Sequence, residues 1–454
     1  MSQRHPQKSE WAQSASICGK LTYTFYLTHP ITITVSAINR IIEFIDSHQL
    51  EAVDLLSRLV QQASTQGNEQ GVQAIVIEKL KSLGLEVDVW DPEYSVLAAH
   101  PYFVPSRKSY AGSPNVVGVL KGSGGGKSII LNGHIDVVPE GDRTKWTHDP
   151  FSGRVENGKI YGRGTTDMKG GNVSMLLAME AIVRSGIKLK GDIVFQSVIE
   201  EEAGGVGTLA TLIRKYKADA ALIPEPTNMK LFIKQQGSMW FRVTVEGRSA
   251  HGGTRYEGVS AIEKAIVIHQ AILELERRRN SRINDPLYSG IPIPVPINMG
   301  KIQGGSWPSS VADLVTIEGR IGVAPEEEMD AVKTELNHCV AEVSGKDPWL
   351  KDHPANVEFF GAQWVPNSLR HDHPFAEVMK TAYQQVYQKP VKLEASPWGT
   401  DGGLLGKVGG IPTLIIGPGE TKVAHYPDEY IEIEEMIRAA KVFANVLIDW
   451  CGVA

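Results

Sequence analysis

The segment "LNGHIDVVP", residues 131–139, carries two polar residues where a buried strand is expected. Its apolar residues indicate a strand in the protein interior, yet His134 and Asp136 stand two positions apart within it. Because residues i and i+2 of a strand point to the same face, both polar side chains project to one side. Burying an imidazole and a carboxylate is unfavourable unless each has a partner, so other segments must supply these partners.

Segments with strand-like and helix-like patterns alternate along most of the chain. The expected strands are 85–90, 115–120, 128–133, 192–199, 219–223 and 412–416. The expected helices are 36–60, 67–84, 170–185, 205–216, 373–387 and 432–450. This alternation predicts an α/β fold with a mostly parallel central sheet, in which functional residues gather at the carboxyl ends of the strands.

A different pattern interrupts the alternation in the middle of the chain. It reads as a strand, a long helix over 258–279, a proline-rich loop, two strands and a helix over 326–343, which is typical of a compact α+β unit. The predicted organisation is an N-terminal extension over 1–34, a catalytic domain over 35–236, the inserted unit over 237–344, and the rest of the catalytic domain over 345–454.

Composition excludes several classes of protein. The net charge of −6 gives no reason to expect a nucleic-acid partner, and no segment approaches the roughly 20 apolar residues of a membrane helix. The basic run Arg277-Arg278-Arg279 is interpreted as the C-terminal turn of a helix, where cations are favourable. Three widely spaced cysteines indicate neither a disulfide framework nor a cysteine-based zinc site, and they favour a cytoplasmic location.

The glycine-rich segment "KGSGGGKS", residues 121–128, resembles a phosphate-binding loop. The first glycine of that motif would stand at position 121, which is Lys121, and a strand follows where the motif needs a helix. We interpret the segment as the tip of a β-hairpin, and the sequence therefore argues against a P-loop nucleotide hydrolase.

Residues able to bind metals recur where the expected strands end. They are Asp167 in "GRGTTDMKGG", Glu200, Glu201 and Glu202 in "SVIEEEAGG", Glu225 in "LIPEPT" and His425 in "GPGETKVAHYPDEY". Each has an ordinary explanation when taken singly, such as a helix N-cap or a solvated turn carboxylate. Together, two His, one shared Asp and two Glu can hold two zinc ions, and one carboxylate remains as a base. In this hypothesis His134 binds a metal, and Asp136 holds its other ring nitrogen.

The order of seven motifs resembles that of the co-catalytic zinc amidohydrolase family, which includes acetylornithine deacetylase, succinyl-diaminopimelate desuccinylase, aminoacylase and carboxypeptidase G. The motifs are "GHIDVVP", "GRGTTDMKGG", "EEEAGG", "PEPT", "GRSAHGG", "GTDGG" and "AHYPDE". The resemblance covers about residues 40–450, and it implies a zinc-peptidase-like catalytic domain with an inserted dimerisation or lid domain. It also implies one zinc on His134 and Glu225, a second on Glu202 and His425, and Asp167 bridging both, with a cis peptide after it.

The resemblance implies further roles outside the metal ligands. Glu201 corresponds to the general base, and Asp136 supports the metal ligand His134. His251 in "GRSAHGG" corresponds to a histidine that reaches the partner's active site in dimers and stabilises the oxyanion. Arg320 in "IEGRIG" corresponds to an arginine that binds a substrate carboxylate through two parallel hydrogen bonds. The sequence departs from the family pattern at Trp307, where relatives often carry an asparagine that contacts substrate.

The resemblance predicts hydrolysis of the amide bond of a small N-acylated amino acid or related amine. Two divalent ions would assist, zinc first, with cobalt or manganese sharing the ligand set. A metallo-exopeptidase or dipeptidase and a formylaminopyrimidine deformylase are alternatives with the same metal chemistry. An inactive metal-binding interaction protein is the alternative of another class, and the intact ligand set argues against it. We expect a cytoplasmic homodimer acting on a small molecule, without a nucleic-acid or membrane partner.

Overall fold

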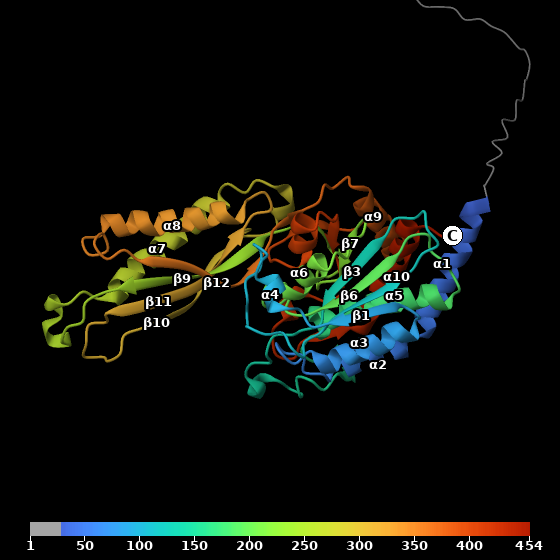
Figure 1. Cartoon of the computed structure of the whole chain (residues 1–454), viewed down its shortest axis with the longest axis horizontal. Coiled ribbons are helices and arrows are strands. Elements are labelled where there is room, and N and C mark those ends of the chain that lie inside the picture. The colour runs from blue at the N-terminus through green and yellow to red at the C-terminus, as the bar shows by residue number, and fades with distance from the viewer. Residues whose placement is uncertain (1–28) are drawn as a thin grey trace, which may run out of the picture.

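The computed structural model describes residues 29–454, which form two lobes joined side by side (Figure 1). Most of the N-terminal extension expected over 1–34 lies outside the described residues. The larger lobe, on the right in Figure 1, contains the central sheet and most of the helices. None of the helices described over residues 29–454 is both long and apolar enough to cross a lipid bilayer.

A nine-stranded sheet forms the centre of the larger lobe, in the order β1-β2-β6-β3-β7-β15-β8-β13, with β14 also pairing with β8. Its four central strands, β6, β3, β7 and β15, run parallel, whereas β1, β2, β8 and β13 join by antiparallel pairs. The strands are β1 (Glu86–Trp90), β2 (Asn115–Leu120), β3 (Ile129–His134), β6 (Ile193–Val198), β7 (Ala221–Ile223), β8 (Leu231–Gln235), β13 (Asn367–Ser368), β14 (Leu393–Ser396) and β15 (Thr413–Ile415). The expected α/β class with a parallel centre is confirmed.

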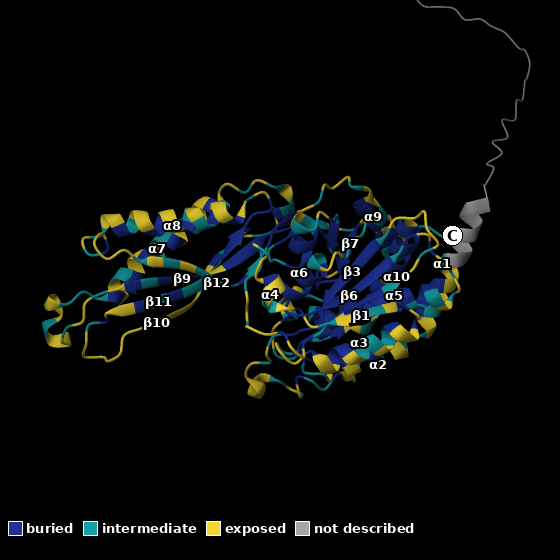
Figure 2. Ribbon diagram, in the orientation of Figure 1, coloured by how far each residue is buried: buried dark blue, intermediate teal, exposed yellow. Residues whose placement is uncertain are grey.

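The central strands are buried along their whole length, as Figure 2 shows in dark blue. Successive residues of these strands belong to two separate apolar clusters. Leu131 and Phe195 lie in one cluster, and Ile130 and Val194 lie in the other. Because adjacent strand residues point to opposite faces, the sheet has an apolar cluster on each face. The helices of this lobe are α1 (His29–Ser47), α2 (Gln49–Val60), α3 (Gln70–Ser82), α4 (Tyr94–Leu97), α5 (Gly170–Arg184), α6 (Val206–Ile213), α9 (Pro374–Tyr387) and α10 (Ile433–Cys451).

The connection between β2 and β3 differs from the prediction. These strands are not neighbours, because β6 lies between them and pairs with both. The prediction of a hairpin tip over residues 121–128 is therefore wrong. The sequence of a short glycine-rich connection does not show whether the two strands that it joins pair directly. A third strand from a distant part of the chain can lie between them.

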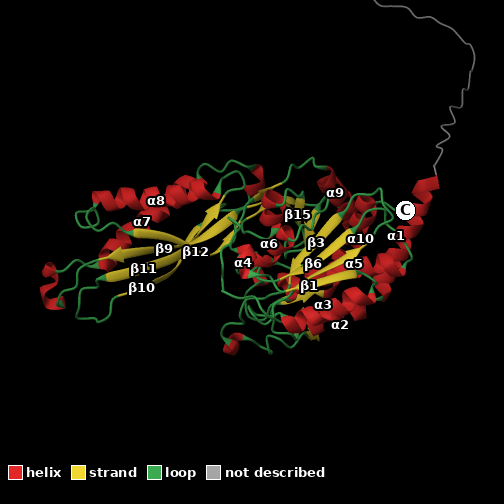
Figure 3. Ribbon diagram, in the orientation of Figure 1, coloured by secondary structure: helices red, strands yellow, loops and turns green. Residues whose placement is uncertain are grey.

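The smaller lobe is a four-stranded antiparallel sheet, in the order β10-β11-β9-β12, with two helices packed against it (Figure 3). Its elements are β9 (Gly237–Glu246), α7 (Ala261–Asn280), β10 (Ile297–Gly304), β11 (Leu314–Val323), α8 (Met329–Lys346) and β12 (Asn356–Trp364). It has an apolar cluster of its own. The fourth strand, β12, comes from beyond residue 344, so we define the inserted lobe as residues 237–364.

A small three-stranded sheet, in the order β16-β5-β4, joins two distant segments of the larger lobe. Its strands are β4 (Arg154–Glu156), β5 (Lys159–Tyr161) and β16 (Tyr430–Glu432). Because Tyr161 pairs with Tyr430, the segment after β5 lies beside the segment that precedes β16. These two segments carry Asp167 and His425, which the sequence predicted to act together.

The basic run at the end of α7 supplies a test of the inserted lobe's stability. Arg279 is buried and contacts Glu327 at 2.6 Å and Glu335 at 2.7 Å, whereas Arg277 is exposed and pairs with Glu274. Arg279→Ala removes the cation from Glu327 and leaves Glu335 paired with Arg282 alone, so we expect the free energy of unfolding to fall by about 3 kcal/mol. Arg277→Ala should change it by less than about 0.5 kcal/mol.

Urea denaturation of the full chain, followed by circular dichroism, measures both variants. Equal small effects of the two substitutions would contradict the assignment of Arg279 as the buried anchor of α7.

Candidate metal centre

Four neighbouring parallel strands end at one edge of the central sheet, and the residues that follow them converge. His134 is the last residue of β3, Glu201 and Glu202 follow β6, Glu225 follows β7, and His425 lies in the segment after β15. The carboxyl ends of parallel strands share an edge, so side chains distant in sequence meet there. Asp167 joins them from the segment after β5, and its peptide bond to Met168 is cis.

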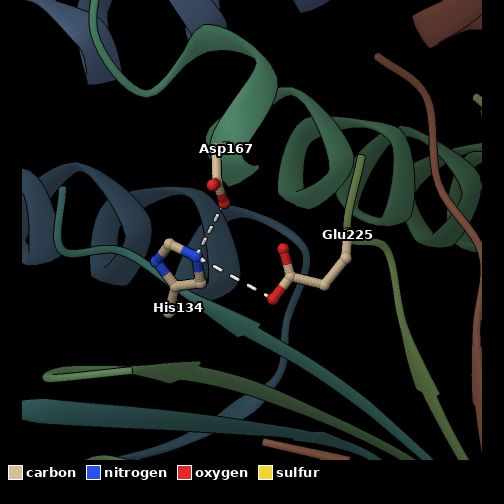
Figure 4. Close-up of side chains that lie close together, drawn as sticks. All are labelled: His134, Asp167 and Glu225. Atoms are coloured by element: carbon tan, nitrogen blue, oxygen red, sulfur yellow. Dashed lines mark hydrogen bonds and ion pairs between the residues drawn. The ribbon is translucent and has the colours of Figure 1, made fainter. Parts of the chain in front are cut away.

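Two groups of potential metal ligands share Asp167. One comprises His134, Asp167 and Glu225, and the other Asp167, Glu202 and His425, with ligand atoms within 4.8 Å of one another in each group. Oδ1 of Asp167 lies 3.1 Å from Nε2 of His134, and Oδ2 lies 3.2 Å from Nε2 of His425. Figure 4 shows the first group, in which three side chains from different elements point toward one another. Asp167 thus presents one oxygen to each group.

The charges of this cluster fit divalent cations. Burial raises the pKa of Glu225 and of Glu201 well above the usual range, and neighbouring carboxylates raise both further. Burial opposes protonation of His425, but hydrogen bonds with Asp167 and Glu202 outweigh it and raise the pKa of His425 to about 11. A divalent ion would relieve this repulsion among carboxylates. Imidazole nitrogen with carboxylate oxygen is a donor set that suits zinc, cobalt and manganese.

Asp136 contacts His134 differently from the prediction. Nδ1 of His134 lies 2.9 Å from the main-chain carbonyl oxygen of Asp136, but 3.7 Å from its carboxylate. The carboxylate instead accepts the backbone N–H groups of Glu201 and Glu202, each at 3.2 Å. The carbonyl therefore orients the imidazole and leaves Nε2 free for a ligand, while the carboxylate fixes the loop after β6. Spacing alone predicted the shared side of the strand, but not which oxygen makes the contact.

The three adjacent glutamates after β6 point to different partners. Glu200 is fully buried, and its carboxylate lies 2.7 Å from Nε of Arg107. It has a left-handed φ of 59°, uncommon for a residue other than glycine, which turns the chain sharply at this point. Glu201 lines the cavity and accepts a hydrogen bond from Nε1 of Trp364 at 3.0 Å, while Glu202 faces the second ligand group. This divergence reduces the repulsion among the three carboxylates.

Glu429 links the segments that carry Asp167 and His425, and the sequence did not identify it as functional. Its Oε1 accepts three backbone N–H groups between Gly164 and Asp167, at 3.0–3.1 Å, and its Oε2 accepts a hydrogen bond from Arg163 at 2.6 Å. Arg163 also donates to the carbonyl of His425 at 3.3 Å. The signal available in the sequence was a charged residue inside each of two motifs, Arg163 four positions before Asp167 and Glu429 four positions after His425.

A cavity of about 660 Å³ opens beside the two ligand groups, which is a suitable size for a small molecule. Both lobes contribute to its wall. The lining residues are Val138, Pro139, Asp167, Glu201, Glu202, Glu225, Pro226, Ser238, Trp240, Arg320, Trp364, Trp398, Gly399, Thr421, Ala424 and His425. The sequence did not identify the three tryptophans of this wall.

The structure separates the two residues that the resemblance placed near substrate. Arg320 lines the cavity, and burial lowers the pKa of its guanidinium. No carboxylate within residues 29–454 offsets this effect by pairing with it. His251 is exposed on the loop after β9, where its Nδ1 accepts the N–H of Gly253, and it does not line the cavity. Trp307 is 69% exposed and also lies outside the cavity wall.

Comparison with known proteins agrees with this geometry. The profile of peptidase family M20/M25/M40 matches residues 130–449. The chain is 32% identical over 433 residues to the N-formyl-4-amino-5-aminomethyl-2-methylpyrimidine deformylase of Bacillus subtilis, covering 90% of this chain and 96% of that protein. It is 27% identical over 395 residues to the acetylornithine deacetylase of Vibrio parahaemolyticus, covering 84% and 93%.

Among solved structures, a dinuclear metal binding peptidase of the M20 family from Bacillus subtilis has a TM-score of 0.61 and 16% identity, covering 89% of this chain and 99% of its own. The expected relation to acetylornithine deacetylase and the expected enzyme class are confirmed. A family profile over most of the chain, together with a relative above 30% identity, shows that the chain belongs to peptidase family M20/M25/M40 and is a hydrolase of that family.

Proposed function

We propose that the chain is a two-metal hydrolase that removes a small acyl group from the nitrogen of a small-molecule amine. His134 and Glu225 would hold one ion, Glu202 and His425 the other, and Asp167 both. The observation that carries this proposal is the shared carboxylate of Asp167, with one oxygen 3.1 Å from His134 and the other 3.2 Å from His425. Zinc is our first choice, because it prefers this mixture of imidazole and carboxylate ligands.

Glu201 is the proposed general base. When bound, the two ions supply Lewis acidity, which polarises the amide carbonyl and makes water a stronger acid. Glu201 lines the cavity and belongs to neither ligand group, so its carboxylate is available for proton transfer. It takes a proton from water as the oxygen attacks the carbonyl carbon, and it returns that proton to the amine nitrogen as the C–N bond breaks. Asp136 holds the backbone of Glu201 during these steps.

A formylated aminomethylpyrimidine, or a related heteroaromatic amine, is our first candidate substrate. The deformylase relative acts on a compound of this kind and matches nearly the whole chain. An N-acylated amino acid is the second candidate, and Arg320 supports it. Its half-buried guanidinium pairs with no carboxylate of the described chain. It can therefore bind the carboxylate of a substrate. A dipeptide presents the same groups and is the third candidate.

We also propose that the enzyme is a homodimer joined through the inserted lobe. The strand β10 lies at an open edge of its sheet, and its Ile302 is 61% exposed. The neighbouring helix α7 exposes Ile262, Ile266 and Leu273, which helical spacing places on one stripe. An unpaired strand edge beside an apolar stripe suits a self-complementary contact with a second copy. His251 would then serve the partner's cavity, since it is exposed and outside its own.

A cytoplasmic location is part of the proposal. Within residues 29–454, Cys339 and Cys451 are both buried and free of disulfides, as expected for a protein of a reducing compartment. Recovery of the native protein from the extracytoplasmic fraction of its cells would contradict this location.

Glu201→Gln tests the reaction. The variant keeps the shape of the side chain but cannot accept a proton, so we expect kcat to fall by a factor of about 10²–10⁴ while two metals remain bound. Amine release is measured with N-formyl-aminomethylpyrimidine, N-acetyl and N-succinyl amino acids, and dipeptides, and metal content by elemental analysis. Glu51→Gln, in the first turn of α2, is the matched control and should retain full activity.

Each outcome of this panel assigns the reaction. Hydrolysis of one acyl class that disappears in Glu201→Gln supports the proposal and identifies the substrate, whereas cleavage of dipeptides alone would make the enzyme a peptidase. Full activity of Glu201→Gln would contradict the role of Glu201 as base.

Ile266→Glu tests the dimer. A charge in the apolar stripe of α7 should shift the sedimentation coefficient from dimer to monomer and lower kcat/KM at least tenfold, because the monomer lacks the partner's His251. Ala341→Glu, on α8 away from the stripe, should leave both quantities unchanged. A wild-type chain that sediments as a monomer and is fully active would refute the proposed dimer.

A further inference from the structure

Three tryptophans line the cavity beside the candidate metal centre, and the proposed hydrolysis requires no indole at these positions. Trp240 lies on β9, Trp364 ends β12, and Trp398 follows β14. The first two come from the inserted lobe and the third from the larger lobe. The centroids of the Trp240 and Trp364 rings are 6.5 Å apart, with 54° between their planes. The cavity therefore presents a broad aromatic wall beside its carboxylates.

The indoles are held in place by their surroundings. A Cβ at Gly361 would lie 2.6 Å from the ring of Trp240, and a Cβ at Gly399 would lie 2.4 Å from Cβ of Trp364. Both glycines therefore allow the backbone to pack directly against a tryptophan. Trp398 packs edge-to-face on Phe232, with 5.7 Å between ring centroids. A rigid wall loses little conformational entropy when it binds a ligand.

Part of this wall remains uncovered. Trp240 lines the cavity and is still 39% exposed. Arg320 on β11 is the residue directly opposite Trp240 on β9. Because opposed residues of an antiparallel pair project from the same face, the guanidinium and the indole lie on one side of the sheet. A flat ring placed against Trp240 would therefore have hydrogen-bond donors nearby for an acceptor atom on its edge.

We propose that Trp240 and Trp398 form a recognition surface for a flat heteroaromatic ring on the amine part of the substrate, with Arg320 donating to a ring acceptor atom. Stacking on an indole requires a π face, which a saturated ring of the same size lacks. This inference deepens the proposed function and rests on it for the bond that is broken. The recognition surface itself is a property of the cavity and can be tested by binding alone.

The test compares N-formylbenzylamine with N-formylcyclohexylmethylamine, which have rings of similar size but differ in aromaticity. We expect the wild-type enzyme to have a kcat/KM at least tenfold higher for the aromatic compound. Trp240→Leu and Trp398→Leu should each lower the aromatic value about tenfold and the saturated value less than twofold. Trp349→Leu, which removes an indole that stacks on His353 outside the cavity, is the matched control and should change neither value.

A second arm measures the binding of benzylamine and cyclohexylmethylamine by titration calorimetry, without turnover. We expect benzylamine to bind more tightly than cyclohexylmethylamine, and Trp240→Leu to abolish this difference. This result supports the recognition surface even if neither formamide is cleaved. In that case the proposed function fails and the inference stands. Equal kcat/KM values for the two formamides, equal losses for both in the tryptophan variants, or equal binding of the two amines would overturn the inference. Even then, release of amine from any substrate of the panel would still support the proposed amide hydrolysis.

Discussion

The carboxylate of Asp167 is the group on which the rest of the site depends. His134 comes from the central sheet and His425 from a distant segment, and a single side chain lies within hydrogen-bond distance of both. Burial opposes ionisation of Asp167, yet hydrogen bonds from the two imidazoles lower its pKa, so the carboxylate stays charged. Glu429 and Arg163 fix the backbone on either side of this contact.

A site so rich in buried carboxylates is stable only if each has a compensating partner. Glu200 has Arg107, and Asp136 has two backbone N–H groups. Glu225 faces only the imidazole of His134, at 4.0 Å, and Glu201 accepts the indole N–H of Trp364 but pairs with no cation of the described chain. Burial raises the pKa of both carboxyls. Under the proposed function, the same divalent ions would offset the repulsion among these carboxylates and supply the Lewis acidity that the reaction needs.

The sequence predicted the central strands and the residues at their ends because both signals are local. An apolar run followed at once by His134, Glu201 or Glu225 is visible in a short window. The order of the strands was less accessible, because β6 enters between β2 and β3 from far along the chain. The same limit applies to β12, which completes the sheet of the inserted lobe from beyond residue 344. Pairing between distant strands depends on three-dimensional packing that no short window contains.

The aromatic wall of the cavity was unpredictable for a related reason. Trp240, Trp364 and Trp398 lie in three separate segments, and each alone is an ordinary core or surface residue. Their shared position in one cavity wall depends on how the two lobes meet. Spacing also does not determine whether the carbonyl or the carboxylate of Asp136 is the partner of His134, because both groups belong to the same residue.

Anomalous diffraction from crystals of the zinc-loaded enzyme, measured at the zinc absorption edge, is the most direct test of the shared carboxylate. We predict two zinc ions, one bound by His134 and Glu225 and the other by Glu202 and His425, each also bound by one oxygen of Asp167. A single ion, or two ions that share no ligand, would contradict the two-metal centre on which the proposed reaction rests.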